Sequence, residues 1–196
     1  MPTGVALRDV REQLFAAADR ILVRDGPNAL TSRAVTTEAG VAKGVLHKHF
    51  TDFDDFLAAY VLARADQMLP AATALREAAG TGTITGNITE ALTAVFGSVA
   101  VAIVALITFR DELRARLRET WPVGIPVLTN VVTLIADYLK AERTLGRLNP
   151  RAEPDFLAPM LVGAAHLLYA DRTGPTPDSA TIRTAVAAAL SGAVPE

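Results

Sequence analysis

Residues 31–50 read TSRAVTTEAGVAKGVLHKHF. This pattern predicts two short helices joined by a tight turn. Thr31 is a good N-cap, because its hydroxyl can accept a hydrogen bond from an unpaired backbone N–H of the first turn. Gly40 stands where the first helix must stop, since glycine enters the left-handed region without a Cβ clash. The second helix is expected to run from about Ala42 to His49.

The expected second helix has one apolar and one cationic face. Leu46 and Phe50 lie four residues apart, so they share a side that can pack on the first helix. Lys43, His47 and Lys48 fall on the other side. This slim, cationic surface has the shape and charge needed to enter a DNA major groove. The alternative interpretation is a surface helical hairpin with a solvated charged face.

The residues before this stretch favour the DNA interpretation. An amphipathic helix with Leu14, Ala18, Ile21 and Leu22 facing inward is expected over residues 8–24, ended by Asp25-Gly26-Pro27. With this helix included, the chain resembles the tetracycline-repressor (TetR) family of one-component transcriptional regulators. The resemblance spans roughly Arg11 to Tyr60. The matching residues are Ala17-Ala18, Ile21-Leu22, Gly26, Thr31, Ala39-Gly40-Val41, Lys43-Gly44, Leu46, His49-Phe50 and Phe56-Leu57.

The rest of the 196-residue chain shows helical periodicity and no alternating strand pattern of useful length. We therefore expect an all-α protein with about nine helices. A helix from residue 52 towards 79, with a kink or break at Pro70, should be followed by a glycine-rich loop over residues 80–86. Later helices are expected near 110–119, 126–145, 155–171 and 177–192. The resemblance implies a helix-turn-helix DNA-binding domain over 1–51 and a helical ligand-binding and dimerisation domain over 52–196.

The charge distribution agrees weakly with this division. Residues 1–50 carry seven Lys/Arg and five Asp/Glu, a balance of +2, whereas residues 51–196 carry twelve and sixteen, a balance of −4. The N-terminal part therefore has the sign of charge that a groove-binding module needs.

The sequence lacks the motifs that indicate metal binding or catalysis. The chain has no cysteine, and only His47 and His49 among its three histidines are close in sequence, so we expect no metal site. It has no Gly-rich phosphate loop and no nucleophile elbow. We predict a protein that is not an enzyme and has no cofactor. A helical enzyme with its site in the C-terminal part remains an alternative.

Residues 91–109 form an uncharged run of nineteen residues, about the length needed to span a bilayer. The run is rich in alanine, contains three Thr/Ser residues and lacks basic clusters at both ends. We interpret it as a central helix enclosed by others, with a membrane-associated helical protein as the alternative. The N-terminus has no basic-then-apolar signal pattern, so a cytoplasmic protein without a membrane partner is predicted.

Lys43 is the best candidate for a guanine edge or a phosphate. Gly44 would permit close approach to the DNA backbone, and Val45 could meet a thymine methyl group. The family commonly has a polar residue at position 45 and a tyrosine at position 47, so the operator sequence cannot be derived. The DNA-binding residues that we predict are Ser32, Arg33, Lys43, Gly44, Val45, His47, Lys48 and His49.

The resemblance also implies double-stranded operator DNA as a partner, a ligand cavity within residues 85–170 and a homodimer through the last two helices. Few charges lie in the apolar helices, so a neutral, largely apolar effector is expected. Asn130 and His166 are polar residues in apolar surroundings and could orient it, although a satisfied core residue is the alternative for each. The candidate ligand residues are Phe96, Ile103, Phe109, Trp121, Leu128, Asn130, Tyr138, His166 and Tyr169. The expected protein is a homodimeric repressor of an inverted-repeat operator.

Overall fold

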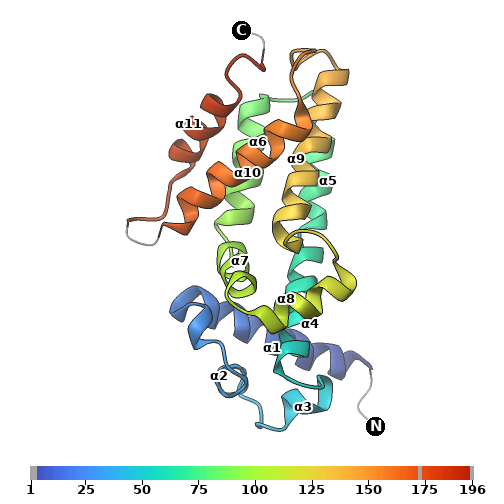
Figure 1. Ribbon diagram of the computed structural model, residues 1–196, viewed down its shortest axis with the longest axis vertical. Helices are drawn as coiled ribbons and strands as arrows, with labels where there is room; N and C mark the ends of the chain where they lie inside the picture. Colours follow the sequence, from blue (N-terminus) through green and yellow to red (C-terminus); the bar gives the residue numbers. More distant parts are fainter. Residues whose placement is uncertain (1–3, 172–173, 195–196) are drawn as a thin grey trace. The chain divides into compact units, whose positions relative to one another are not determined.

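The computed structural model describes residues 4–171 and 174–194, and these form eleven α-helices and one 3-10 helix without a strand (Figure 1). The all-α prediction is confirmed. The helices are α1 Gly4–Asp25, η1 Pro27–Ala29, α2 Ser32–Glu38, α3 Val45–His49, α4 Phe53–Asp66, α5 Leu69–Glu77, α6 Ile84–Phe96, α7 Ala100–Thr108, α8 Asp111–Thr120, α9 Pro126–Thr144, α10 Pro154–Ala170 and α11 Ser179–Ala189.

The chain divides into two compact units. Unit 1 comprises residues 1–64 and 102–125, and unit 2 comprises residues 65–101 and 126–196. Most of α4 and all of α8 therefore group with the N-terminal helices. The proposed domain boundary after residue 51 stays a prediction.

Two breaks account for the difference between the nine expected helices and the eleven found in the described residues. The helix expected over 52–79 is divided into α4 and α5, and Pro70 stands in the first turn of α5, where its missing N–H is not needed. The uncharged run 91–109 is divided into α6 and α7. Gly97 ends α6, and the Ser98 hydroxyl donates to the Val95 carbonyl and accepts from the Ala100 N–H. One serine thus stabilises the end of one helix and the start of the next.

The break also bears on the membrane alternative. Among the residues that the structure describes, no single helix is long and apolar enough to cross a membrane. Helices α6 and α7 reach the required length and composition only as a pair, across the break at residues 97–99.

The loop expected over 80–86 is shorter than predicted, because α6 begins at Ile84. Thr83 is its N-cap, with the side-chain oxygen accepting from the Gly86 N–H at 3.0 Å. A Cβ on Gly86 would lie 2.7 Å from that same oxygen. The glycine that suggested a loop is thus needed inside the first turn, where it leaves room for the cap.

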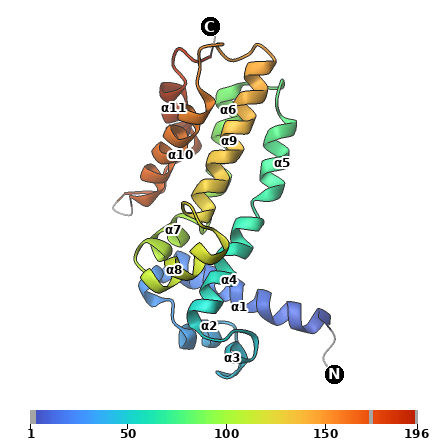
Figure 2. The same ribbon diagram turned by 45° about the vertical axis from the view of Figure 1, so that its right-hand side comes forward.

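Unit 2 is a helical bundle of α5, α6, α9, α10 and α11. Helix α9 packs against α5 and α10, and α11 packs against α6 and α10. Figure 2 shows α10 and α11 side by side on one flank of this bundle. The interior side chains are aliphatic and at most 2% exposed; they include Ile88, Leu92, Val131, Ile135, Leu139, Leu161 and Ile182.

A buried polar network joins α9 to the glycine turn that precedes α6. Glu142 is 0% exposed. One of its carboxylate oxygens accepts from the Tyr138 hydroxyl at 2.6 Å and from the Gly80 N–H at 3.2 Å. The Tyr138 hydroxyl in turn accepts from the Asn87 amide at 2.9 Å. The other carboxylate oxygen lies 3.4 Å from Arg147 Nε, close enough for an ion pair but without a hydrogen bond.

Candidate nucleic-acid interface

The first helix of the predicted motif begins and ends as the sequence indicates. Thr31 caps α2, its hydroxyl accepting from the Ala34 N–H at 3.1 Å. Gly40 has a φ of +67°, in the left-handed region that side chains disfavour. The Val41 N–H then donates to the Thr36 carbonyl at 3.0 Å. This hydrogen bond closes the turn and sends the chain towards α3.

The second helix is shorter than predicted. Helix α3 starts at Val45 rather than at about Ala42, and Lys43 and Gly44 lie in the turn before it. The Val45 N–H donates to the Ala42 carbonyl at 2.9 Å, which closes that turn. Glycine is a poor helix former, and so short a segment gains too few hydrogen bonds to extend through it.

Packing rather than intrinsic helix propensity holds α3 in place. Leu46 is 0% exposed and Phe50 is 4% exposed, as predicted from their shared face. The Phe50 ring contacts the rings of Phe15 and Phe56, with centroids 6.1 and 5.2 Å away. Because Phe15 belongs to α1 and Phe56 to α4, these rings anchor the end of α3 on both neighbouring helices.

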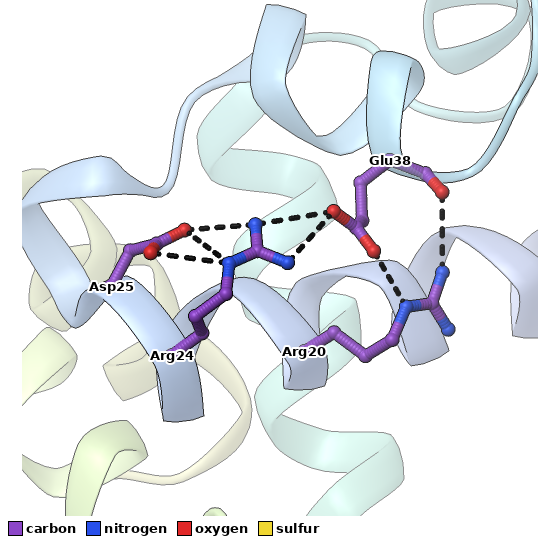
Figure 3. Close-up of polar contacts among 4 residues, drawn as sticks. All are labelled: Arg20, Arg24, Asp25 and Glu38. Atoms are coloured by element: carbon purple, nitrogen blue, oxygen red, sulfur yellow. Dashed lines mark hydrogen bonds and ion pairs between the residues drawn. The ribbon is translucent and has the colours of Figure 1, made fainter.

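Helix α2 is tied to α1 by arginines, as Figure 3 shows. Arg20 donates to the Glu38 carboxylate at 2.7 Å and to the Glu38 carbonyl at 3.2 Å. Arg24 donates to the other Glu38 oxygen at 3.2 Å and is paired with Asp25 as well. Hydrogen bonds from Arg20 and then Arg24 hold the pKa of Glu38 below its ordinary value. These contacts hold the C-terminal end of α2, just before the turn at Gly40, against α1.

A second network joins α4 to α1, and sequence patterns gave no signal for it. Arg64 is only 7% exposed, and it pairs with Asp19 at 2.8 Å and with Glu12 at 3.0 Å. The Tyr60 hydroxyl donates to the same Asp19 carboxylate at 2.5 Å. Burial, reinforced by Asp19, raises the pKa of Tyr60, so its hydroxyl keeps the proton that it donates.

Six of the residues predicted to meet DNA lie within residues 43–49, and Ser32 and Arg33 lie at the start of α2. Arg33, Lys43, Gly44, His47 and Lys48 are exposed, whereas Ser32, Val45 and His49 are partly covered. The His49 ring lies 6.4 Å from the Phe50 ring, so part of its surface is used in packing. Within residues 4–171 and 174–194, none of the cations Arg33, Lys43 and Lys48 forms an ion pair. Their charges are therefore available to an anionic partner.

Comparison with known proteins agrees with this geometry. Residues 14–60, which run from the middle of α1 to the middle of α4, match the family described as bacterial regulatory proteins, tetR family. Over this segment the chain is therefore similar to the tetR family. It is 38% identical over 52 residues to an uncharacterized HTH-type transcriptional regulator of Haemophilus influenzae. That match covers 26% of this chain and spans only 28% of the length of the curated relative.

The fold of the whole chain is shared with solved tetR-type structures. One is a putative TetR-family transcriptional regulator from Mesorhizobium loti, with a TM-score of 0.72, 15% identity and coverage of 96% of this chain and 98% of that one. Another is the transcriptional regulator FadR from Bacillus subtilis in complex with stearoyl-CoA, with a TM-score of 0.68, 16% identity and coverage of 92% and 98%. At such low identity these likenesses establish the tetR-type fold alone.

The candidate ligand residues have varied surroundings. Phe96, Ile103 and Tyr138 are buried, whereas Phe109 is 83% exposed. Trp121, Leu128, Asn130, His166 and Tyr169 are half-buried. Both hydrogen-bonding capacities of the Tyr138 hydroxyl are used by Asn87 and Glu142, and the Asn130 amide donates to the Ala65 carbonyl at 3.4 Å. These two side chains therefore have internal structural roles.

Three of the candidates do come together where α6 and α10 meet in unit 2. The Phe96 ring lies 5.8 Å from the His166 ring and 6.2 Å from the Tyr169 ring. His166 Nδ1 is buried without a hydrogen-bond partner among the described residues, and burial lowers the pKa of this imidazole. The Thr93 hydroxyl is also buried and unpaired; it was not among the predicted residues. Its position three residues before Phe96, on the same helix face, is the signal that could have found it.

Proposed function

We propose that this protein is a sequence-specific DNA-binding transcriptional regulator, most simply a repressor. The observation that carries the proposal is the solvent-facing segment from Lys43 to Lys48. Its lysines form no ion pair with any residue that the structure describes, and its backbone is fixed by the buried side chains of Leu46 and Phe50. A rigid, slim, cationic segment can enter a major groove and hold its side chains in register with base edges.

The protein acts as a homodimer in this proposal. Helix α10 carries large apolar side chains on its outer surface: Phe156 is 72% exposed, Met160 is 59% and Leu167 is 72%. Their spacing of four and seven residues places them on one stripe of the helix. A second copy of the chain related by two-fold symmetry would bury both stripes. The operator should then be an inverted repeat with half-sites about one helical turn or more apart.

A small, largely apolar effector releases the DNA. An effector can do so only by binding more tightly to a conformation of the dimer in which the two Lys43–Lys48 segments, the DNA-reading segments, are wrongly spaced for the operator. Within unit 2, the aromatic rings of Phe96 and Tyr169 together with unpaired His166 Nδ1 support the α6–α10 contact as part of the effector site.

The decisive experiment is selection of bound fragments from genomic DNA, followed by sedimentation of the protein with and without the recovered fragment. We expect one inverted-repeat sequence and a dimer at micromolar concentration. Recovery of no preferred sequence would refute DNA recognition. A monomer both free and on DNA would refute the dimer while leaving DNA recognition intact.

A further inference from the structure

The junction between α3 and α4 carries three carboxylates in a short space. Asp52, Asp54 and Asp55 follow α3 within six residues of His49. Unneutralised, they would repel the phosphates that Lys43 and Lys48 are placed to attract. The same acids also lie at the start of α4, and two of them cap this helix, so they have a structural role.

Two of these acids cap α4. Asp52 accepts from the Asp55 N–H at 2.7 Å, and the Asp55 carboxylate accepts from the Thr51 N–H at 2.8 Å. This reciprocal arrangement works like a capping box and fixes the chain between the two helices. The Asp55 N–H, and secondarily Arg116, hold the pKa of Asp52 below its ordinary value, so the cap is ionised at neutral pH.

Two arginines from α8 and the residue before it bind all three acids. Arg110 Nε lies 2.7 Å from Asp54, and its guanidinium lies 5.3 Å from the centre of the Phe53 ring. Arg116 is 2.8 Å from Asp52 and 3.8 Å from Asp55. All of these residues belong to unit 1. We call these two arginines and three aspartates the Arg–Asp clamp.

Apolar packing does not close this contact completely. A groove of about 460 Å³ opens between α4 and α8, with Ala58, Ala59 and Leu62 on one side and Arg116 and Leu117 on the other. Because that part of the contact is unfilled, the clamp holds the start of α4 against α8 where side-chain packing does not. The start of α4 is separated from the end of α3 by only Phe50, Thr51 and Asp52. Whatever fixes this start therefore also fixes the DNA-reading segment.

We propose that Arg110 and Arg116 are positioning residues for DNA binding, which orient α3 through the three aspartates at the start of α4. This inference rests on the proposed function. The arginines act through Asp52, Asp54 and Asp55 and do not themselves contact DNA.

The test compares three single variants, R110Q, R116Q and R114Q, in fluorescence anisotropy with the operator recovered by genomic selection. Arg114 is the matched control: it stands on the same helix and loses the same charge, but it pairs with Asp111 and the Thr108 carbonyl instead of with α4. We expect R110Q and R116Q to weaken operator binding by about 3- to 20-fold, the product of a modest ion-pair loss in each protomer. R114Q should change the affinity by less than about two-fold.

Salt dependence and a mutant cycle separate positioning from direct contact. A cation that touches a phosphate lowers the salt slope by about one when it is removed, whereas loss of a positioning residue leaves the slope unchanged. D54N combined with R110Q should weaken binding no more than R110Q alone. Equal affinity of R110Q, R116Q and the wild type for the operator would overturn the proposal. A reduced salt slope in R110Q or R116Q would also overturn it, and so would additive losses of affinity from D54N and R110Q.

A measurement without DNA keeps this inference distinct from the proposed function. The Thr51 amide, which donates to the Asp55 carboxylate, should exchange its hydrogen faster in R116Q than in R114Q. The comparison requires that the two variants have the same melting temperature. If the wild type selects no DNA sequence, the proposed function fails, and equal exchange in the two variants would then refute the clamp by itself. Faster exchange in R116Q would support the clamp even so.

Discussion

Glu142 offers the sharpest test of how unit 2 is held together. Glu142→Ala leaves the Tyr138 hydroxyl and the Gly80 N–H without their shared acceptor, at a cost of about 1–3 kcal/mol each. It also removes one buried methylene group, worth about 1 kcal/mol. Arg147 is 30% exposed and can turn to water, and relief from burying a carboxylate offsets part of the loss. We expect a net cost of about 3–5 kcal/mol, as for breaking other buried ion pairs.

Thermal unfolding followed by circular dichroism measures this cost, at one protein concentration because the proposed dimerisation would shift the midpoint. For a chain of this size the expected fall is about 10 °C, at about 2–4 °C per kcal/mol. Lys140→Ala is the control: it stands on the same helix and loses an ion pair with Asp155, but that pair is exposed and should cost at most about 0.5 kcal/mol. If Glu142→Ala melted within about 2 °C of Lys140→Ala, the network would not stabilise the fold as argued.

Three further predictions concern other parts of the chain. Lys43→Ala should weaken operator binding and reduce the salt slope by about one per protomer, and an unchanged slope in a salt titration would remove Lys43 from the interface. Phe53→Ala should lower unfolding stability by about 1–2 kcal/mol in a urea titration, because its half-buried ring stacks on Phe56 at 5.6 Å; an unchanged midpoint would contradict a packing role. The pKa of His166 is lowered in the folded state, so the unfolded state binds more protons below about pH 6.5 and stability should fall as the pH drops below that value. His166→Phe should lose this part of the acid sensitivity when melting temperatures at pH 7.5 and 5.5 are compared, and an unaltered difference would refute the assignment.

The helix-turn-helix was predictable because its signals are local. Thr31 caps a helix through an atom three residues away, and Gly40 ends it through its own backbone conformation. Leu46 and Phe50 are buried because of a spacing of four on one helix. Each of these inferences needs only neighbouring residues, so no knowledge of the tertiary fold was required.

The polar networks were not predictable, because their members are far apart in sequence. Arg64 meets Asp19 across 45 positions, and Glu142 meets Gly80 across 62. Nothing in the sequence distinguishes these charges from ordinary solvated ones until the helices are packed. The break in the run 91–109 was missed for a different reason: hydropathy describes side chains, whereas Gly97 and Ser98 end α6 through backbone and hydroxyl hydrogen bonds.

The pairing of charges explains why so small a net charge can serve a DNA-binding surface. In unit 1 the arginines Arg20, Arg24, Arg64, Arg110 and Arg116 are all bound to carboxylates, whereas Arg33, Lys43 and Lys48 have no ion pair among the described residues. Counting charges along the sequence averages these two groups and gives only +2 for residues 1–50. The folded chain separates them: paired charges fix the helices, and the unpaired ones, at the start of α2 and within residues 43–48, stay exposed to solvent. The local field beside a phosphate depends mainly on the unpaired group, because the fields of two closely paired opposite charges largely cancel at distances greater than their separation.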